Sequence, residues 1–139
     1  MARRAYNSQN VTGIITYKGQ KNFIVGVEKG SSFKASRNSD KYKLQGGMKG
    51  EGAFSATNDN SGKIEFSLMQ DSPTNKLLDE ICNDDETFDI EITDGNAITK
   101  GFVVATECVI NKQADWERGA EMKARKWVIS CPNLKMGDE

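Results

Sequence analysis

Side chains suited to catalysis or metal binding are scarce in this sequence. The chain of 139 residues has no histidine, so the usual general base near neutral pH is missing, and with it the Ser-His-Asp and Cys-His arrangements. The three cysteines, Cys82, Cys108 and Cys131, are widely spaced and include no Cys-x-x-Cys pair, a pattern that does not favour zinc. We therefore interpret them as buried free thiols in a reducing compartment and expect no metal and no cofactor.

Two other clusters contain residue types that occur in active sites. Asp84, Asp85 and Glu86 follow a predicted helix, and consecutive carboxylates there are more typical of a solvated turn than of a metal or acid–base site. The glycines from Gly46 to Gly52 do not form the Gly-x-x-x-x-Gly-Lys-Ser/Thr phosphate loop. Composition leaves a Ser-Lys or paired-carboxylate site open. We nevertheless expect that the protein is not an enzyme.

The two tryptophans are the remaining candidates for a binding site. Trp127 lies within a predicted strand, so we interpret it as a core residue. Trp116 lies at a turn, where either a core position or a ligand platform fits the sequence.

Composition indicates a single folded domain. Charged residues make up 28% and hydrophobic residues 37% of the chain, and the formal net charge is −1, so no overall basic field attracts nucleic acid. The apolar runs have the length of strands, far below the ~20 residues that span a bilayer. No apolar segment follows Arg3 and Arg4, so we expect no signal peptide and a cytoplasmic location.

Alternating apolar residues predict mainly β structure. The expected strands cover residues 11–17, 22–28, 30–37, 53–57, 63–70, 88–92, 102–110 and 125–134. In the longest of these we expect one face to be formed by Phe102, Val104, Thr106, Cys108 and Ile110. The predicted fold is an antiparallel β-sandwich or open barrel of about seven to eight strands with one packed α-helix.

One helix is clearly signalled. Ser72 is the expected N-cap and Pro73 the first helical residue, where the missing N–H costs nothing. Leu77, Leu78 and Ile81 form its apolar stripe, and we expect the helix to end near Asn83.

Two segments lack a periodic pattern. Residues 1–10 are predicted to be a flexible N-terminal arm, and residues 11–139 a single domain. Within this domain, residues 38–52 are rich in glycine and are predicted to be a long loop. Loops of this length in compact domains usually have a function.

Charge is unevenly distributed along the chain. The segment Lys34–Glu51 holds five basic residues against two acidic ones, whereas Asp71–Asp94 holds nine carboxylates against Lys76 alone. These can simply be two solvated surfaces. Alternatively, the basic loop of one copy meets the acidic region of the next, a head-to-tail contact that produces rings or filaments.

Three segments resemble the tail tube proteins of contractile-tailed bacteriophages. The most specific is NSGKIEFSLMQDSPTNKLL at residues 60–78, a turn and strand that lead through Ser-Pro into the helix. The others are Val11-Thr12-Gly13, and Trp116-Glu117-Arg118-Gly119 followed by residues 125–129. The resemblance spans nearly the whole chain. It departs at the helix start, because Asn75 occupies the place of a capping-box Glu or Gln.

The resemblance implies a structural virion protein whose hexameric rings stack into the hollow tail tube. Its expected partners are further copies of itself, the tail sheath, baseplate and tail-terminator proteins, and genomic DNA that passes through the lumen without sequence-specific binding, with no membrane. Its expected location is the virion tail, assembled in the host cytoplasm. In such proteins a long loop between early strands reaches the neighbouring ring, which corresponds here to residues 38–52. The residues that we expect to make this contact are Lys34, Arg37, Lys41, Tyr42, Lys43, Leu44, Met48 and Lys49. The charge pattern, rather than the resemblance, suggests Asp79, Glu80, Asp84, Asp85 and Glu86 as the complementary acidic region.

Two alternatives remain open at this level. One is a tube-like secretion-system subunit, a tail terminator or a baseplate component. The other is a monomeric β-barrel that binds a ligand or oligonucleotide through Trp116, Tyr42 and the basic loop.

Overall fold

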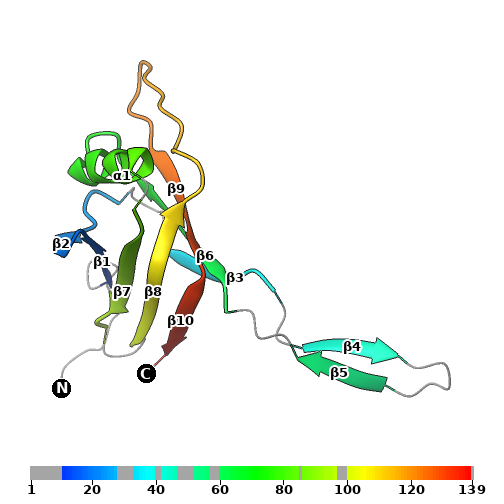
Figure 1. Cartoon of the computed structure of the whole chain (residues 1–139). Coiled ribbons are helices and arrows are strands. Elements are labelled where there is room, and N and C mark those ends of the chain that lie inside the picture. Colours follow the sequence, from blue (N-terminus) through cyan, green and yellow to red (C-terminus); the bar gives the residue numbers. More distant parts are fainter. Residues whose placement is uncertain are drawn as a thin grey trace, which may run out of the picture.

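The protein is described by a computed structural model that covers residues 11–27, 33–39, 60–84, 86–96 and 100–138, together with the backbone of 42–46 and 52–56. In these residues the chain forms ten strands and one helix (Figure 1). In chain order they are β1 (Val11–Tyr17), β2 (Gln20–Phe23), β3 (Lys34–Arg37), β4 (Tyr42–Gly46), β5 (Gly52–Ala56), β6 (Gly62–Leu68), α1 (Pro73–Asn83), β7 (Phe88–Asp94), β8 (Gly101–Ile110), β9 (Arg125–Cys131) and β10 (Asn133–Asp138).

Eight strands form one antiparallel sheet. Its order is β2-β1-β7-β8-β9-β6-β3, and β10 also pairs with β8. The helix lies across the sheet near the end where β8 finishes (Figure 1). This confirms the predicted mainly β fold with one packed helix.

The core is formed by the inward faces of the strands and one side of the helix. Trp127, Phe66 and Ile64 are fully or almost fully buried, and Leu78 and Ile81 of α1 pack into the same cluster. Trp127 is therefore a core residue, as predicted. Its indole N–H donates to Asn75 Oδ1 at 2.9 Å, so the polar edge of this large side chain has a buried partner.

The helix starts at the residues predicted from the sequence, Ser72 and Pro73. Ser72 Oγ accepts from the backbone N–H of Thr74 at 3.2 Å, and Pro73 opens the helix, as predicted. Asn75 does not act as a capping-box residue. Its side-chain amide instead donates to the Met69 carbonyl at 2.8 Å and accepts from Trp127, which ties the helix to the sheet.

The first hairpin is tighter, and its second strand shorter, than the sequence predicts. Lys18 and Gly19 both have positive φ, so a two-residue turn joins β1 to β2 with Tyr17 opposite Gln20. The strand expected to reach residue 28 ends at Phe23. Gly26 then adopts φ +74° beside the Ser72 side chain, where a Cβ would clash, and the chain turns towards the start of the helix.

The prediction that Cys108 lies on the same face of β8 as Phe102 and Val104 is wrong. Ala105 and Cys108, three residues apart, are both buried, because a bulge against β7 shifts the alternation. At the bulge Glu107 has φ +55°, and its backbone N–H donates to Asp89 Oδ1 at 3.1 Å. A bulge of this kind leaves no clear signal in the apolar pattern.

The predicted last strand, 125–134, is in fact two strands that meet at Pro132. β9 pairs with the far end of β8 through Val109 and Ile110, and β10 pairs with its first half from Gly101 to Thr106. The register is the same on both sides of the break. Because proline has no N–H, the ladder is interrupted there and resumes beyond it.

The segment predicted as the loop 38–52 contains a strand. β4 pairs with β5 as a separate two-stranded hairpin, which Figure 1 shows projecting away from the main sheet. The prediction failed because a hairpin that lies apart from the core is not required to show the period-two apolar pattern on which strand prediction depends.

Candidate assembly surfaces

The predicted acidic region is partly engaged within the molecule. The Arg125 guanidinium, only 4% exposed, donates to both carboxylate oxygens of Asp79, at 2.9 and 3.0 Å. Gln113 Nε2 donates to the same carboxylate at 2.7 Å. Burial alone would raise the pKa of Asp79, but these hydrogen bonds and the Arg125 charge bring it below its usual value. Asp79 is therefore engaged by Arg125 and Gln113 within the molecule.

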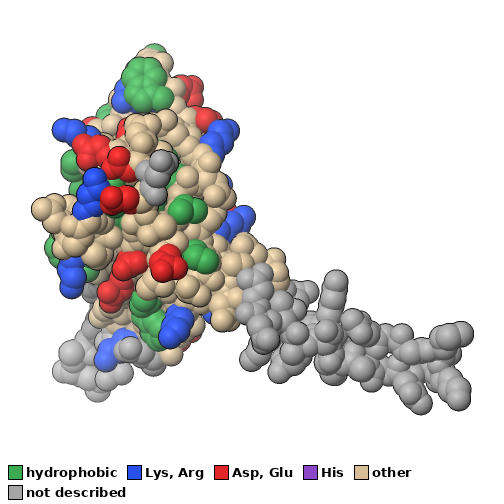
Figure 2. Space-filling view, viewed as in Figure 1, with side chains coloured by type: hydrophobic (Ala, Val, Ile, Leu, Met, Phe, Trp, Pro, Cys, Tyr) green, Lys and Arg blue, Asp and Glu red, His purple; other side chains and the backbone are tan. Residues whose placement is uncertain are grey.

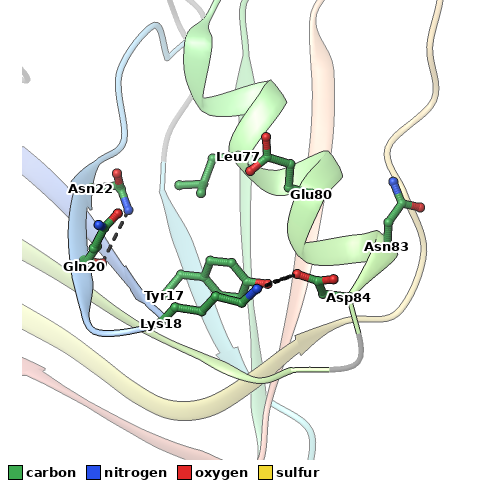
Figure 3. Close-up of a pocket in the computed structure, with 8 residues that line it drawn as sticks. All are labelled: Tyr17, Lys18, Gln20, Asn22, Leu77, Glu80, Asn83 and Asp84. Atoms are coloured by element: carbon green, nitrogen blue, oxygen red, sulfur yellow. Dashed lines mark hydrogen bonds and ion pairs between the residues drawn. The ribbon is translucent and has the colours of Figure 1, made fainter.

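Asp84 is also held by the chain itself, at the far end of α1. It accepts a short hydrogen bond from the Tyr17 hydroxyl, and its carboxylate lies 3.2 Å from Lys18 Nζ (Figure 3). The hydrogen bonds from Tyr17 and Lys18, together with the charge of Lys18, lower the pKa of Asp84. Glu80 and Glu86 are exposed, and Asp85 lies outside the described residues.

A polar hollow of about 600 Å³ opens beside this contact, between the first hairpin and the helix. Figure 3 shows Gln20 and Asn22 of β2 on one side, with Leu77 and Glu80 of α1 on the other. Within the described residues, no group of three His, Cys, Asp or Glu side chains could hold a metal ion. The hollow carries no arrangement that indicates a reaction.

The basic segment is likewise only partly engaged within the molecule. Arg37 donates to the Asn60 carbonyl at 2.9 Å and to the Leu134 carbonyl at 2.6 Å, so it ties β3 to β10. Lys34 on the same edge strand is exposed. Of the other predicted residues, Tyr42, Lys43 and Leu44 lie on β4, which is described by its backbone, and Lys41, Met48 and Lys49 lie outside the described residues.

A second surface, which the charge pattern did not reveal, is the connection 111–124 between β8 and β9. Trp116 is 67% exposed, and the Arg118 guanidinium lies 4.4 Å from its ring centroid. Met122, in the same connection, is 50% exposed. Figure 2 shows apolar side chains at this end of the molecule, with basic and acidic side chains close by.

The connection is fixed at both of its ends. Arg125 donates to the carbonyl oxygens of Ala114 at 2.8 Å and Asp115 at 3.3 Å. The backbone N–H of Lys123 donates to Gln70 Oε1 at 3.1 Å. Sequence reasoning missed Arg125 in this role. The available signal was an arginine at an inward-facing position of the alternating strand β9, where its charge requires a partner.

The outer face of the sheet is mostly polar. On β7 the outward residues are Asp89, Glu91 and Thr93, all exposed, and neighbouring β1 contributes Thr12. The outward positions of β8 add the exposed Phe102 and the partly exposed Val104.

Among the described residues, no helix is long and apolar enough to cross a membrane.

Comparisons with known proteins identify the fold and nothing narrower. No protein-family model and no curated protein sequence matches the chain. One similar solved structure is a chain in the anti-feeding prophage cap (the AFP tube terminating cap), 11% identical with a TM-score of 0.62 over 100% of this chain and 95% of that one. A chain in the virion of the native gene transfer agent particle is 12% identical, with a TM-score of 0.60, over 97% of this chain and 99% of that one. A chain in the six-fold symmetrised anti-feeding prophage baseplate is 12% identical, with a TM-score of 0.59, over 98% and 97%. This protein therefore has the same fold as these chains of the anti-feeding prophage and the gene transfer agent particle.

Proposed function

We propose that this protein is a structural subunit of a phage tail, and specifically a tube subunit that forms stacked, hexameric rings around a channel for DNA. The observation that supports the proposal is the likeness of fold to chains of these particles, which covers 97–100% of this chain and 95–99% of each of those chains. The strand–Ser-Pro–helix segment at residues 60–78 supports it independently.

The sheet supplies a physical reason for assembly. The strands at the two ends of its order, β2 and β3, lack a neighbour on one side within the described chain, and such edges are stabilised by pairing or by closure into a barrel. Joining the sheets of several copies would pair these edges. The outer face of β1, β7 and β8 would then line the channel, where Asp89 and Glu91 repel phosphates and let DNA slide.

The proposed partners follow from this role. The subunit would contact copies of itself in the ring and between rings, and at the tube's surface and ends the sheath, baseplate and terminator proteins. It would reside in the virion tail after assembly in the host cytoplasm. Its function would be mechanical rather than catalytic, which agrees with structural neighbours that come from particles and not from enzymes.

Negative-stain microscopy of the purified protein tests the proposal directly. We expect hollow rods, or rings that become rods as the protein concentration rises. A protein that keeps the monomer mass by light scattering at high concentration would contradict the proposal. Gain of thermal stability with a small ligand or oligonucleotide would then favour the monomeric binding module instead.

A cap or baseplate role is the second candidate, because two of the similar chains come from such assemblies. Rings of fixed number that never stack, at any concentration tested, would favour this role over the tube.

A further inference from the structure

Cys108 of β8 and Cys131 of β9 lie opposite each other in the core, on strands that run side by side (Figure 1). The ladder pairs Val109 with Ser130, so the next position in the same register pairs the two cysteines. Their side chains are 0% and 1% exposed, and the Cys108 thiol donates to Cys131 Sγ at 3.6 Å. Both thiols are free. The two sulfur atoms are therefore in contact across neighbouring strands, 23 residues apart in sequence.

The two thiols share the core side because both strands are irregular at the same level. Strict alternation from the buried Ala105 on β8 and Leu134 on β10 would place both cysteines on the outer face. Instead, residues 106–107 on one strand and residues 132–133 opposite them are exposed in succession, and each strand then returns a cysteine to the core. On β8 this irregularity includes the positive φ of Glu107. Backbone strain of this kind is concentrated at functional positions.

The contact makes the two thiols chemically unequal. The hydrogen bond from Cys108 lowers the pKa of Cys131, against the effect of burial. The same hydrogen bond, together with burial, raises the pKa of Cys108. Burial and the charge of Asp79 raise the pKa of Cys82, the third cysteine. The thiolate is the nucleophilic form of cysteine, so Cys131 is the residue that reacts first.

We propose that Cys108 and Cys131 are a redox-active pair, which peroxide converts into a disulfide between β8 and β9. First, Cys131 Sγ attacks one peroxide oxygen, the O–O bond breaks, and the departing hydroxide takes the thiol proton and leaves as water. Cys131 is then a sulfenic acid. Next, Cys108 Sγ attacks this sulfur, the S–O bond breaks, and the released hydroxide takes the Cys108 proton. In total the two thiols lose two electrons and two protons, and one peroxide molecule is reduced to two molecules of water.

The buried position of the pair selects a small oxidant. Hydrogen peroxide needs only a narrow opening, whereas the disulfide of glutathione would require the two strands to separate. The sulfur atoms must approach from 3.6 Å to the ~2.05 Å of a disulfide bond. The new bond would join β8 to β9 beside Pro132, where proline contributes no N–H to the ladder. This inference does not depend on the proposed function.

Mass spectrometry of the purified full chain tests the pair. The reduced protein is treated with hydrogen peroxide, then denatured and labelled with iodoacetamide. We expect the loss of two hydrogen atoms, one label in place of three, and a proteolytic fragment in which Cys108 and Cys131 are linked. Linking cysteines that are 23 residues apart should also raise the thermal unfolding midpoint by about 5 °C or more, and a reducing agent should reverse this rise.

Cys82→Ala is the matched control, and it should keep both the linked fragment and the rise in the unfolding midpoint. Cys108→Ala should lose both, and its Cys131 should gain oxygen instead. The wild-type protein alone decides the pairing, whether or not these variants fold. Absence of the linked fragment after peroxide treatment of the folded wild type would overturn the inference. Linkage through Cys82, or a bond between Cys108 and Cys131 that forms only in urea, would overturn it too.

Discussion

Arg125 contacts the helix, the sheet and the connection 111–124 at once. It neutralises Asp79, holds the connection 111–124 through two carbonyls, and lies 4.8 Å from the centroid of Trp127. One residue thus joins helix, sheet and loop. Because Arg125 is buried and Asp79 is partly buried, loss of one partner leaves the other charge with less solvation than it has in the unfolded chain.

Arg125→Ala should lower the free energy of unfolding by about 3 kcal/mol, the low end for a broken buried pair, since Asp79 is still about one-third exposed. Urea unfolding measures this. The double variant Arg125→Met/Asp79→Leu removes both charges and should be clearly more stable than Arg125→Ala. Equal loss in the two variants would mean that packing, not charge, dominates at this position.

The same pair predicts how stability depends on pH. The pKa of Asp79 is lower in the folded than in the unfolded chain, so its contribution is complete above the unfolded pKa of about 3.9 and is lost as pH falls through the folded value. Asp84 acts in the same direction. We expect Asp79→Asn to flatten the acid limb of a stability–pH curve, whereas Glu80→Gln, one residue away, serves as control. An unchanged acid limb in Asp79→Asn would contradict this assignment.

At the scale of elements, β8 carries the main irregularity of the sheet. Glu107 occupies a left-handed conformation that costs a non-glycine residue about 1–2 kcal/mol. Glycine avoids this cost, but it loses more chain entropy on folding, which cancels part of the gain. Glu107→Gly should therefore raise the free energy of unfolding by about 0.5–1 kcal/mol. The bond to Asp89 uses the backbone N–H and remains.

Glu107→Ala is the matched control for that gain. Alanine removes the same carboxylate but keeps the strained φ, so its stability should stay near that of the wild type. If both substitutions stabilise the protein equally, the gain comes from removing charge and not from backbone relief.

Sequence reasoning worked where local chemistry decides the structure. Ser72 and Pro73 predicted the start of the helix, the β-branched run at 11–17 predicted β1, and the alternation at 88–92 predicted all but the last two residues of β7. It failed where a contact distant in sequence decides. Pro132 ends one strand only to begin another on the same neighbour, and Asp79 looked like surface charge until Arg125, 46 residues away, was placed beside it. Periodicity contains no information about either.

At the scale of the whole molecule, the proposed stacking predicts a contact between copies through the projecting hairpin β4–β5, whose strand β4 carries Lys43 and is flanked in sequence by Lys41 and Lys49. Reversing Lys41, Lys43 and Lys49 to Glu should impair stacking and leave the unfolding midpoint unchanged, because β4 and β5 form a sheet separate from the main one. Sedimentation at increasing salt distinguishes the cause, since screening should weaken stacking of the wild type. If the triple variant polymerises normally, the hypothesis that this segment acts through charge complementarity is wrong.

The break at Pro132 also has a mechanical meaning. β8 runs without interruption from Gly101 to the connection 111–124, while its partner on one side is divided into β9 and β10. A push along the length of the molecule would therefore be carried by the continuous backbone of β8 and by shear across its ladder with β7. Bending would concentrate at the level of Glu107 and Pro132, where both ladders are irregular. Under a load along its length, the molecule would therefore bend at this one level.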